Sequence, residues 1–182
     1  TDSKGRTWKC STPLVLSFDG APADFAPAAG SFDLDRSEAS IQSDWPTART
    51  PWLALDRNGN GRVDDGGELF GSGTTLLDGT RADNGFFALR ELDANRDGAI
   101  TADDPAYASL VLWADSNRDR ESQPTELASL ASRGVHRIEL GYRQQPRCDA
   151  RGNCEIERSV MVFDERGTPR MGQVVDLHLM QR

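Results

Sequence analysis

Residues 93–126 read DANRDGAITADDPAYASLVLWADSNRDRESQPTE, and this stretch decides how we expect the chain to fold. Two acidic segments within it, residues 93–104 and 115–126, follow one template. Acidic or amide side chains occupy positions 1, 3 and 5 of each segment, and a carboxylate closes it at position 12. Because both segments keep this spacing, we expect each to curl into a loop around its own centre.

This spacing is that of the EF-hand calcium loop. Calcium takes six to eight oxygen ligands at about 2.3 to 2.6 Å, so the backbone must curl tightly around the ion. Positions 1, 3 and 5 point inward, position 7 offers its backbone carbonyl, position 9 often acts through water, and position 12 supplies a carboxylate. The predicted ligands are Asp93, Asn95, Asp97, Ala99 and Asp104 in the first loop, and Asp115, Asn117, Asp119, Glu121 and Glu126 in the second.

A third acidic segment of the same kind begins at Asp56. Its closing carboxylate comes one residue late, after the template's position 12, and the pair Gly66-Gly67 is flexible enough to absorb the extra residue. The predicted ligands are Asp56, Asn58, Asn60, Arg62 through its carbonyl, Asp64 and Glu68. The three loops together predict about three calcium ions per chain.

Position 6 distinguishes the 115–126 loop from the others. Gly61 and Gly98 stand there in the other two loops, and Arg120 stands there in this one. The turn prefers a left-handed backbone, which costs a residue other than glycine about 1 kcal/mol or more. We therefore expect this loop to bind calcium more weakly, and to keep binding because its side-chain ligands remain.

Acidic loops of this kind have an alternative interpretation as metal-free turns, since Asp, Asn and Gly form Asx-turns by themselves. Three such loops in one chain favour metal binding over that alternative. Carboxylates that converge without a cation repel one another, so we expect the fold to loosen when calcium is removed.

Composition narrows the classes of function. The 182 residues carry 29 acidic and 21 basic side chains, a net charge of -8 that argues against a nucleic-acid-binding surface. No apolar run approaches the roughly 18 residues of a membrane span, and the N-terminus does not read as a signal peptide. We expect a flexible segment at residues 1–12 and one domain at 13–182, with a calcium-loop region at 13–134.

The three cysteines predict one pair. Cys148 and Cys154 bracket the turn sequence DARGN, so a disulfide that closes a hairpin tip is expected, worth about 2 kcal/mol. The alternative is a pair of reduced thiols in a cytosolic protein. Cys10 is left without a partner in this chain.

The predicted fold class is α+β, with short helices and EF-hand-like loops on a small antiparallel β scaffold. Expected strands cover 13–18 and 110–113, and expected helices cover 86–92, a brief turn after Pro105, and 124–133. Residues 135–182 alternate between apolar and polar residues and predict a meander with strands at 135–142, 156–163 and 172–179. His136 is expected on the apolar face of this meander, and His178 with Asp176 on the solvated polar face.

Several segments resemble one protein family. They are LVLSFDG (14–20), FDLD (32–35), WLALDRNGNGRVDDGGELFG (52–71), GFFALRELDANRDGAI (85–100) and LVLWADSNRDRESQPTEL (110–127). They look like the calcium-binding region of large secreted bacterial proteins of the RTX and haemagglutinin type, including the FrpC-like calcium-dependent self-processing module. The resemblance implies a secreted or cell-surface location, other domains in a larger parent protein, and folding driven by several calcium ions.

Two departures from the family pattern bear on function. Acidic residues are fewer in the N-terminal segments, which leaves Asp19, Asp33 and Asp35 as weak ligand candidates. Self-processing relatives cut an Asp-Pro bond upstream of the module, whereas the Asp-Pro here is Asp104-Pro105, whose aspartate is explained as a calcium ligand. No catalytic residue is predicted, and the alternative function is self-processing at a bond outside this chain.

Overall fold

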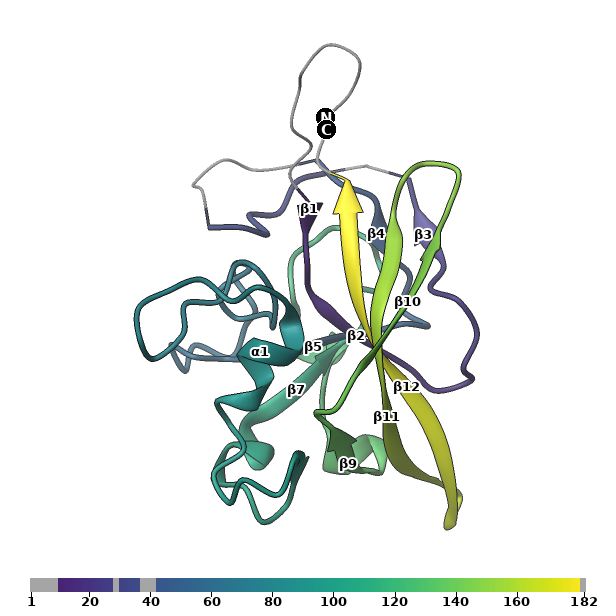
Figure 1. Cartoon of the computed structure of the whole chain (residues 1–182). Coiled ribbons are helices and arrows are strands. Elements are labelled where there is room, and N and C mark those ends of the chain that lie inside the picture. Colours follow the sequence, from purple (N-terminus) through teal and green to yellow (C-terminus); the bar gives the residue numbers. More distant parts are fainter. Residues whose placement is uncertain (1–9, 28–29, 37–41, 181–182) are drawn as a thin grey trace.

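In the computed structural model, which describes residues 10–27, 30–36 and 42–180, short strands follow one another along most of the chain (Figure 1). The strands are β1 (Cys10–Ser11), β2 (Leu14–Ser17), β3 (Phe25–Ala26), β4 (Trp45–Pro46), β5 (Trp52–Leu55), β6 (Ala99–Thr101), β7 (Leu110–Trp113), β8 (Leu127–Ser129), β9 (Val135–Glu139), β10 (Arg143–Cys148), β11 (Cys154–Glu165) and β12 (Thr168–Met180). The helical elements are the α-helix α1 (Gly85–Arg90) and the 3-10 turns η1 (Pro105–Ser109), η2 (Pro124–Glu126) and η3 (Ala131–Arg133).

Ten of these strands form one antiparallel sheet. Its order is β6-β9-β11-β12-β2-β5-β7-β8, with β1 also paired to β12 and β10 to β11, while β3 and β4 form a separate pair. The predicted α+β class is therefore wrong, because the described residues are mostly β and contain a single α-helix of six residues. The acidic loops are attached to strand ends and to this short helix, so they do not need the paired long helices of an EF-hand.

The segment 124–133 shows why helix signals were misleading. Pro124 at a helix start and the spacing of Leu127 and Leu130 predict a helix, yet the chain forms η2, then β8, then η3. Strand β8 hydrogen-bonds along the open edge of β7, pairing Leu127 with Trp113. Satisfying that strand edge outweighs a weak local helix preference.

Both faces of the sheet are buried. Leu14 and Leu16 of β2 lie in one apolar cluster, and Val15 between them lies in a second cluster on the opposite face. The second cluster contains Trp45, Trp52 and Trp113; the Trp45 ring centroid lies 4.9 Å from that of Trp52 and 5.4 Å from that of Trp113. These rings anchor β4, β5 and β7 to one another.

Helix α1 overlaps the predicted segment 86–92, beginning one residue earlier at Gly85 and ending at Arg90. The Asn84 side chain caps it by accepting a hydrogen bond from the Phe87 N–H at 3.0 Å. Gly85 at its first turn lies so close to β2 that a Cβ would stand 2.4 Å from the Leu14 side chain and from the Phe70 carbonyl. A glycine is needed there for the helix to pack on the sheet.

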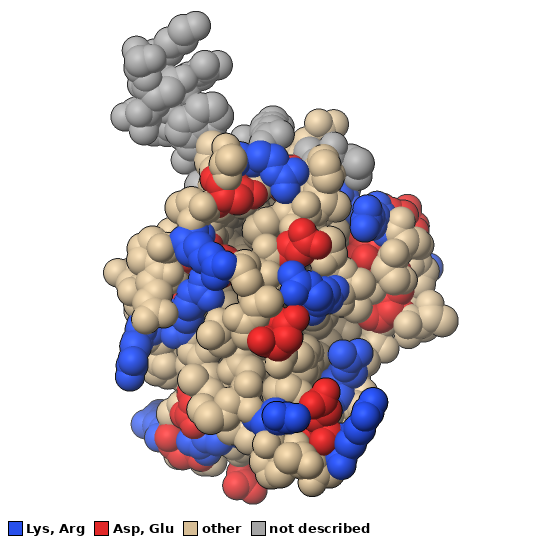
Figure 2. All heavy atoms as spheres, turned by 90° about the vertical axis from the view of Figure 1, so that its right-hand side faces the viewer, with Lys and Arg blue, Asp and Glu red and all other residues tan. Residues whose placement is uncertain are grey.

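The C-terminal third forms adjacent antiparallel strands, as the predicted meander requires, since β9 pairs with β11 and β11 with β12. Two further pairings, of β10 with β11 and of β12 with β2, are not predicted by the pattern of the sequence. The described face in Figure 2 carries interspersed acidic and basic side chains and no continuous patch of one sign. No helix among the described residues is long and apolar enough to cross a membrane.

The disulfide between Cys148 and Cys154 is confirmed, with an S–S distance of 2.04 Å. It closes the turn between β10 and β11. Arg151 within that turn places its Nε 3.2 Å from the buried Asp44 carboxylate and donates to the Phe25 carbonyl at 3.1 Å. The disulfide-closed turn therefore holds the β3-β4 pair against the sheet. The predicted flexible segment 1–12 lies outside the described residues as far as residue 9, and Cys10–Ser11 forms β1.

The expected place of His136 on the apolar face is wrong. The pairing of β9 with β11 jumps from Arg137 to Val135, which makes His136 the extra residue of a β-bulge. Its side chain points outward, and its Nε2 lies 2.9 Å from the Asp164 carboxylate. A bulge shifts the inward and outward alternation, so the period-2 pattern of the sequence could not place this residue.

The expected solvation of Asp176 and His178 is also wrong. Asp176 is fully buried, accepts a hydrogen bond from the Gly85 N–H at 2.5 Å, and has no partner for its other oxygen, Oδ1. Opposite it, β11 has a bulge that includes Glu157, and Glu157 lies 3.0 Å from the Nε2 of the partly buried His178. Burial raises the pKa of Asp176 well above its ordinary value, and the neighbouring Glu157 charge raises it further against the lowering effect of the Gly85 N–H, so this carboxyl keeps its proton to a higher pH than an exposed aspartate.

This protonated carboxyl predicts a pH effect on stability. Between the ordinary pKa of an aspartate, about 3.9, and the raised pKa of folded Asp176, the folded state binds one proton more than the unfolded state. Stability is therefore lost as the pH rises through that window. Asp176→Asn cannot ionise, so its melting temperature should exceed that of the wild type by an amount that grows from about pH 4 to pH 8.

Thermal melts of both proteins at fixed calcium across that range measure this difference. Asp83→Asn is the control, because it removes an exposed carboxylate beside the same helix. A gap between wild type and Asp176→Asn that stays constant with pH would contradict the assignment.

Candidate metal centre

The three acidic loops share one pattern of hydrogen bonds at their first residue. In each, the position 1 carboxylate accepts the backbone N–H of position 6, from Gly61 to Asp56 at 2.7 Å, from Gly98 to Asp93 at 3.0 Å, and from Arg120 to Asp115 at 3.1 Å. Positions 3 and 5 each accept the N–H two residues later, at 2.9 to 3.0 Å. The side chains that the sequence predicts as ligands are thus turned into the loops.

The closing carboxylate follows the same rule. Asp104 accepts N–H groups from Ala94 and Thr101, both at 2.9 Å, which are positions 2 and 9 of its loop. Glu126 accepts those of Ser116 at 2.8 Å and Gln123 at 3.4 Å. In each loop one carboxylate therefore joins the start of the loop to its end.

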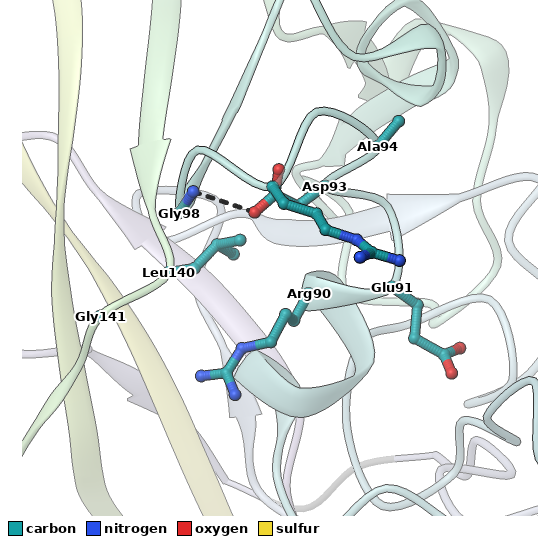
Figure 3. Close-up of a pocket in the computed structure, with 8 residues that line it drawn as sticks. Arg90, Glu91, Asp93, Ala94, Gly98, Leu140 and Gly141 are labelled. Carbon is teal, nitrogen blue, oxygen red and sulfur yellow. Dashed lines mark hydrogen bonds between the residues drawn. The ribbon is translucent and has the colours of Figure 1, made fainter.

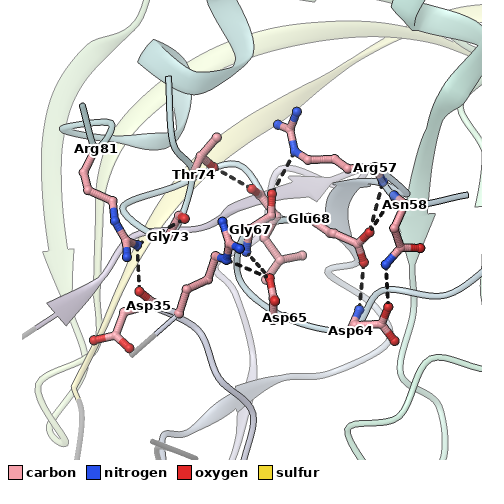
Figure 4. A network of polar contacts seen from close by, with 12 residues as sticks. Asp35, Arg57, Asn58, Asp64, Asp65, Gly67, Glu68, Gly73, Thr74 and Arg81 are labelled. Atoms are coloured by element: carbon pink, nitrogen blue, oxygen red, sulfur yellow. Dashed lines mark hydrogen bonds and ion pairs between the residues drawn. The ribbon is translucent and has the colours of Figure 1, made fainter. Parts of the chain in front are cut away.

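Glu68 takes this closing role despite the extra residue in its loop. Its Oε1 accepts the N–H of Arg57 at 3.0 Å, and its Oε2 accepts that of Asp64 at 2.9 Å (Figure 4). The Asp64 carboxylate in turn accepts the side-chain amides of Asn58 at 3.0 Å and Asn60 at 2.6 Å. These bonds link four of the predicted ligand residues of this loop, Asn58, Asn60, Asp64 and Glu68.

The turn at position 6 is left-handed in all three loops, with φ of 78° at Gly61, 83° at Gly98 and 63° at Arg120. Position 4 is left-handed as well, with φ of 60° at Arg96 and 63° at Arg118. The repeated conformation follows from the bonds to position 1, which require successive N–H groups to point at one carboxylate.

Three carboxylates come within metal-binding distance of one another in the 115–126 loop. One oxygen each of Asp115, Asp119 and Glu126 lies within 4.8 Å of the others, and the described residues contain no second group of this kind among their acidic, histidine and cysteine side chains. Asp115 and Glu126 are buried, whereas Asp119 is exposed. This cluster could hold a metal ion.

The electrostatics of the cluster reflect its burial. Burial raises the pKa of the Asp115 carboxyl, and the negative charges of Glu126 and Asp119 raise it further against the lowering effect of two backbone N–H groups. Burial would also raise the pKa of Glu126, but hydrogen bonds from the Ser116 hydroxyl and from backbone N–H groups lower it below its ordinary value. A bound cation would offset the repulsion that Asp115 feels.

The 93–104 loop gathers its acids less closely. The Asp97 carboxylate lies 3.8 Å from the Arg137 guanidinium of β9, outside the loop. Beside the loop is an open hollow of about 720 Å³ lined in part by Arg90, Glu91 and Leu140, and Figure 3 shows the Asp93 carboxylate hydrogen-bonded to the Gly98 N–H. Asp104 is buried, and with both oxygens bonded to backbone N–H groups it is held away from attack on its own bond to Pro105.

Position 8 links the loops to different partners. Ile100 lies in β6 and pairs with Ile138 of β9, so it anchors the 93–104 loop to the core as predicted. The Ser122 hydroxyl of the 115–126 loop accepts the Val63 N–H at 2.6 Å and donates to the Val63 carbonyl at 3.2 Å. The loops that touch through position 8 are therefore 56–68 and 115–126, which are not neighbours in the sequence.

The weak candidates of the N-terminal segments lie apart from these loops. Asp19 accepts the Ala21 N–H at 2.9 Å and pairs with the Arg49 guanidinium at 3.0 Å, and the first of these bonds lowers its pKa. The backbone carbonyl of Asp33 accepts the Gly66 N–H at 2.7 Å, and that of Asp35 accepts from Arg81 at 2.7 Å. The backbone carbonyls of Asp33 and Asp35 thus support the 56–68 loop and the turn after it from outside.

Sequence reasoning missed two residues of the centre. The sequence predicts Arg120 only as a strained substitute for glycine and predicts no role for Ser122, yet both are buried and bonded to distant segments. The only signal was that each breaks the template at a position where the other loops keep it.

Comparison with known proteins gives a family and a relative. The SPM domain family model matches residues 14–178. Over 167 residues, 90% of this chain, the sequence is 35% identical to the iron-regulated protein FrpA of Neisseria meningitidis serogroup C. The match covers 15% of that protein, so the chain spans a small part of the curated relative.

The geometry predicts which carboxylate matters most to the 115–126 loop. Glu126→Gln keeps the shape of the side chain but removes its charge, so the loop should lose its calcium ion while the other loops keep theirs. Calorimetric titration should then count one ion fewer than in the wild type. Glu165→Gln removes an exposed carboxylate on the distant β11-β12 hairpin and serves as the control; an unchanged count for Glu126→Gln would refute the assignment.

Proposed function

Since the chain belongs to the SPM domain family, we propose that it is a calcium-binding module of a larger secreted protein. In this proposal calcium ions held in EF-hand-like loops drive the folding of the module and staple its short strands together. The ligands are those of the loops 56–68, 93–104 and 115–126, and about three ions bind per chain.

One observation above the others supports this function, the convergence of Asp115, Asp119 and Glu126 to within 4.8 Å. Without a cation these three carboxylates repel one another inside a loop whose ends are buried. A calcium ion supplies the compensating charge and coordinates the oxygens.

The kind of ion follows from the kind of ligand. The three loops offer carboxylate, amide and carbonyl oxygens, which are hard ligands that suit calcium or magnesium rather than zinc or copper. The loops are flexible, multidentate and already curled, with more oxygens than the rigid octahedral shell of magnesium needs. Calcium is therefore the proposed ion.

The proposed location is outside the cytoplasm, in a secreted or cell-surface protein. The disulfide between Cys148 and Cys154 is consistent with an oxidising compartment. The match to 15% of FrpA fits a module attached to other domains. Extracellular fluids supply calcium at concentrations that suit loops of modest affinity.

A second function, calcium-dependent self-processing, is favoured by the family match, because the resembling modules cut an Asp-Pro bond. Asp104-Pro105 does not suit this reaction, since both Asp104 oxygens are engaged within the loop. The scissile bond in this second proposal lies outside the chain.

Calcium should raise the thermal stability of the purified chain. With a dissociation constant of about 10⁻⁴ to 10⁻³ M, roughly 10 mM calcium adds about 1.4 to 2.7 kcal/mol per site by mass action. The melting temperature should rise as the calcium concentration is raised, and it should drop when a chelator is added. Magnesium at the same concentration is the control. A melting temperature that changes with neither calcium nor chelator would contradict the proposal.

Self-processing makes a separate prediction. The mass of this chain should stay intact in calcium, since its one Asp-Pro bond is held in a ligand loop. A longer protein that includes the upstream region should lose mass at an Asp-Pro bond when calcium is added, if it is a self-processing enzyme. Mass spectrometry with and without chelator distinguishes the two, and intact mass in both conditions excludes cleavage.

A further inference from the structure

Arg120 stands at the one position where the 115–126 loop departs from the other two. At Gly61 and Gly98 an added Cβ would meet no atom within 4 Å, so position 6 of those loops faces open space. Arg120 has the same left-handed backbone, with φ of 63°, but only 4% of the residue is exposed. This loop therefore sends its position 6 side chain into the protein interior.

The Arg120 side chain is held there by contacts from outside the loop. One terminal nitrogen, Nη2, donates to the Ser43 carbonyl at 2.6 Å. The guanidinium carbon lies 4.7 Å from the centroid of the Trp45 ring, over its face. A buried cation-π contact stabilises the side chain in this position and opposes the strain of the left-handed backbone.

The backbone of Arg120 meets the metal cluster directly. Its N–H donates to Asp115 Oδ2 at 3.1 Å, while the Arg118 N–H holds Oδ1 at 2.7 Å. Because the side chain of Arg120 is anchored, this N–H is held in place, and it holds the Asp115 carboxylate in the orientation that faces Asp119 and Glu126.

The comparison of loops agrees with this role. Within the described part of the chain, three carboxylates come within 4.8 Å of one another only in the loop whose position 6 is anchored. The loops with glycine at position 6 have the same internal bonds and no such group. We propose that Arg120 is a positioning residue that pre-organises the calcium site of the 115–126 loop and links its occupancy to Trp45.

This inference rests on the proposed calcium-binding function and predicts the direction in which Arg120→Gly changes the calcium affinity. If position 6 only suffers strain, Arg120→Gly relieves that strain and should strengthen calcium binding. If Arg120 pre-organises the site, the same substitution loosens the loop, and part of the free energy of calcium binding is then used to order the loop. We expect the second result.

The test titrates calcium into the full chain by calorimetry and follows tryptophan emission. Arg120→Gly should weaken the 115–126 site about tenfold or more and abolish the calcium-dependent change in emission. Arg118→Gly is the matched control, since Arg118 is an exposed residue with the same φ of 63° in the same loop. It relieves equal strain without removing an anchor and should keep both the affinity and the emission change.

Two further variants separate the possible failures. If Arg120→Gly does not fold, Arg120→Lys decides, because lysine keeps the charge and loses the planar guanidinium; affinity equal to the wild type would overturn the inference. Trp45→Phe should remove the emission change and leave the number of ions unaltered. Glu126→Gln tests the premise. If this variant binds as many calcium ions as the wild type, the proposed function is wrong. If it binds one ion fewer while Arg120→Gly binds calcium like the wild type, only the role of Arg120 is wrong.

Discussion

The arrangement of the strands depends on the hydrogen bonds that the closing carboxylate of each acidic loop accepts from backbone N–H groups. Glu126 binds backbone N–H groups at the start of its loop, and its own carbonyl accepts the Ala114 N–H at 3.0 Å, which lets β8 begin beside β7. Glu68 does the same after β5, where Leu69 bridges to Ala54. Strands of three or four residues bury little by themselves, so the loops must hold their ends together.

The C-terminal hairpin supplies what the loops cannot. Strands β11 and β12 are the longest of the sheet. Strand β12 pairs with β2 and thereby holds the N-terminal part of the sheet in place. The N–H of Gly85 at the start of α1 is bonded to Asp176 of β12, and α1 leads directly into the 93–104 loop. The hairpin is thus a scaffold for the loops rather than an appended unit.

What could be predicted from the sequence was local. The frame of each loop depends on bonds that span at most twelve residues, so spacing alone predicts which side chains accept the hydrogen bonds of each loop, including Glu68 with its extra residue. The fold class and the segment 124–133 could not be read this way, because β8 forms to satisfy the edge of β7. His136 was misplaced because a bulge shifts the alternation of β9 and no local pattern announces a bulge, and Asp176 was misplaced because α1 packs on its face of β12 and covers it. Arg120 and Ser122 act on residues more than fifty positions away, which the sequence shows only as broken template positions.

The partnership between loops changes how the module should be understood. Sequence order suggests that 93–104 and 115–126 form a pair, but Ser122 joins 115–126 to Val63 of the 56–68 loop, while 93–104 is fastened through Ile100 to β9. Curling of the 115–126 loop fixes Ser122, and a fixed Ser122 holds both backbone groups of Val63 where the 56–68 loop needs them. The same loop reaches the aromatic cluster through Arg120. The 115–126 loop is therefore bonded both to a second acidic loop and to the aromatic cluster, whereas the loop nearest to it in sequence is fastened to a different strand.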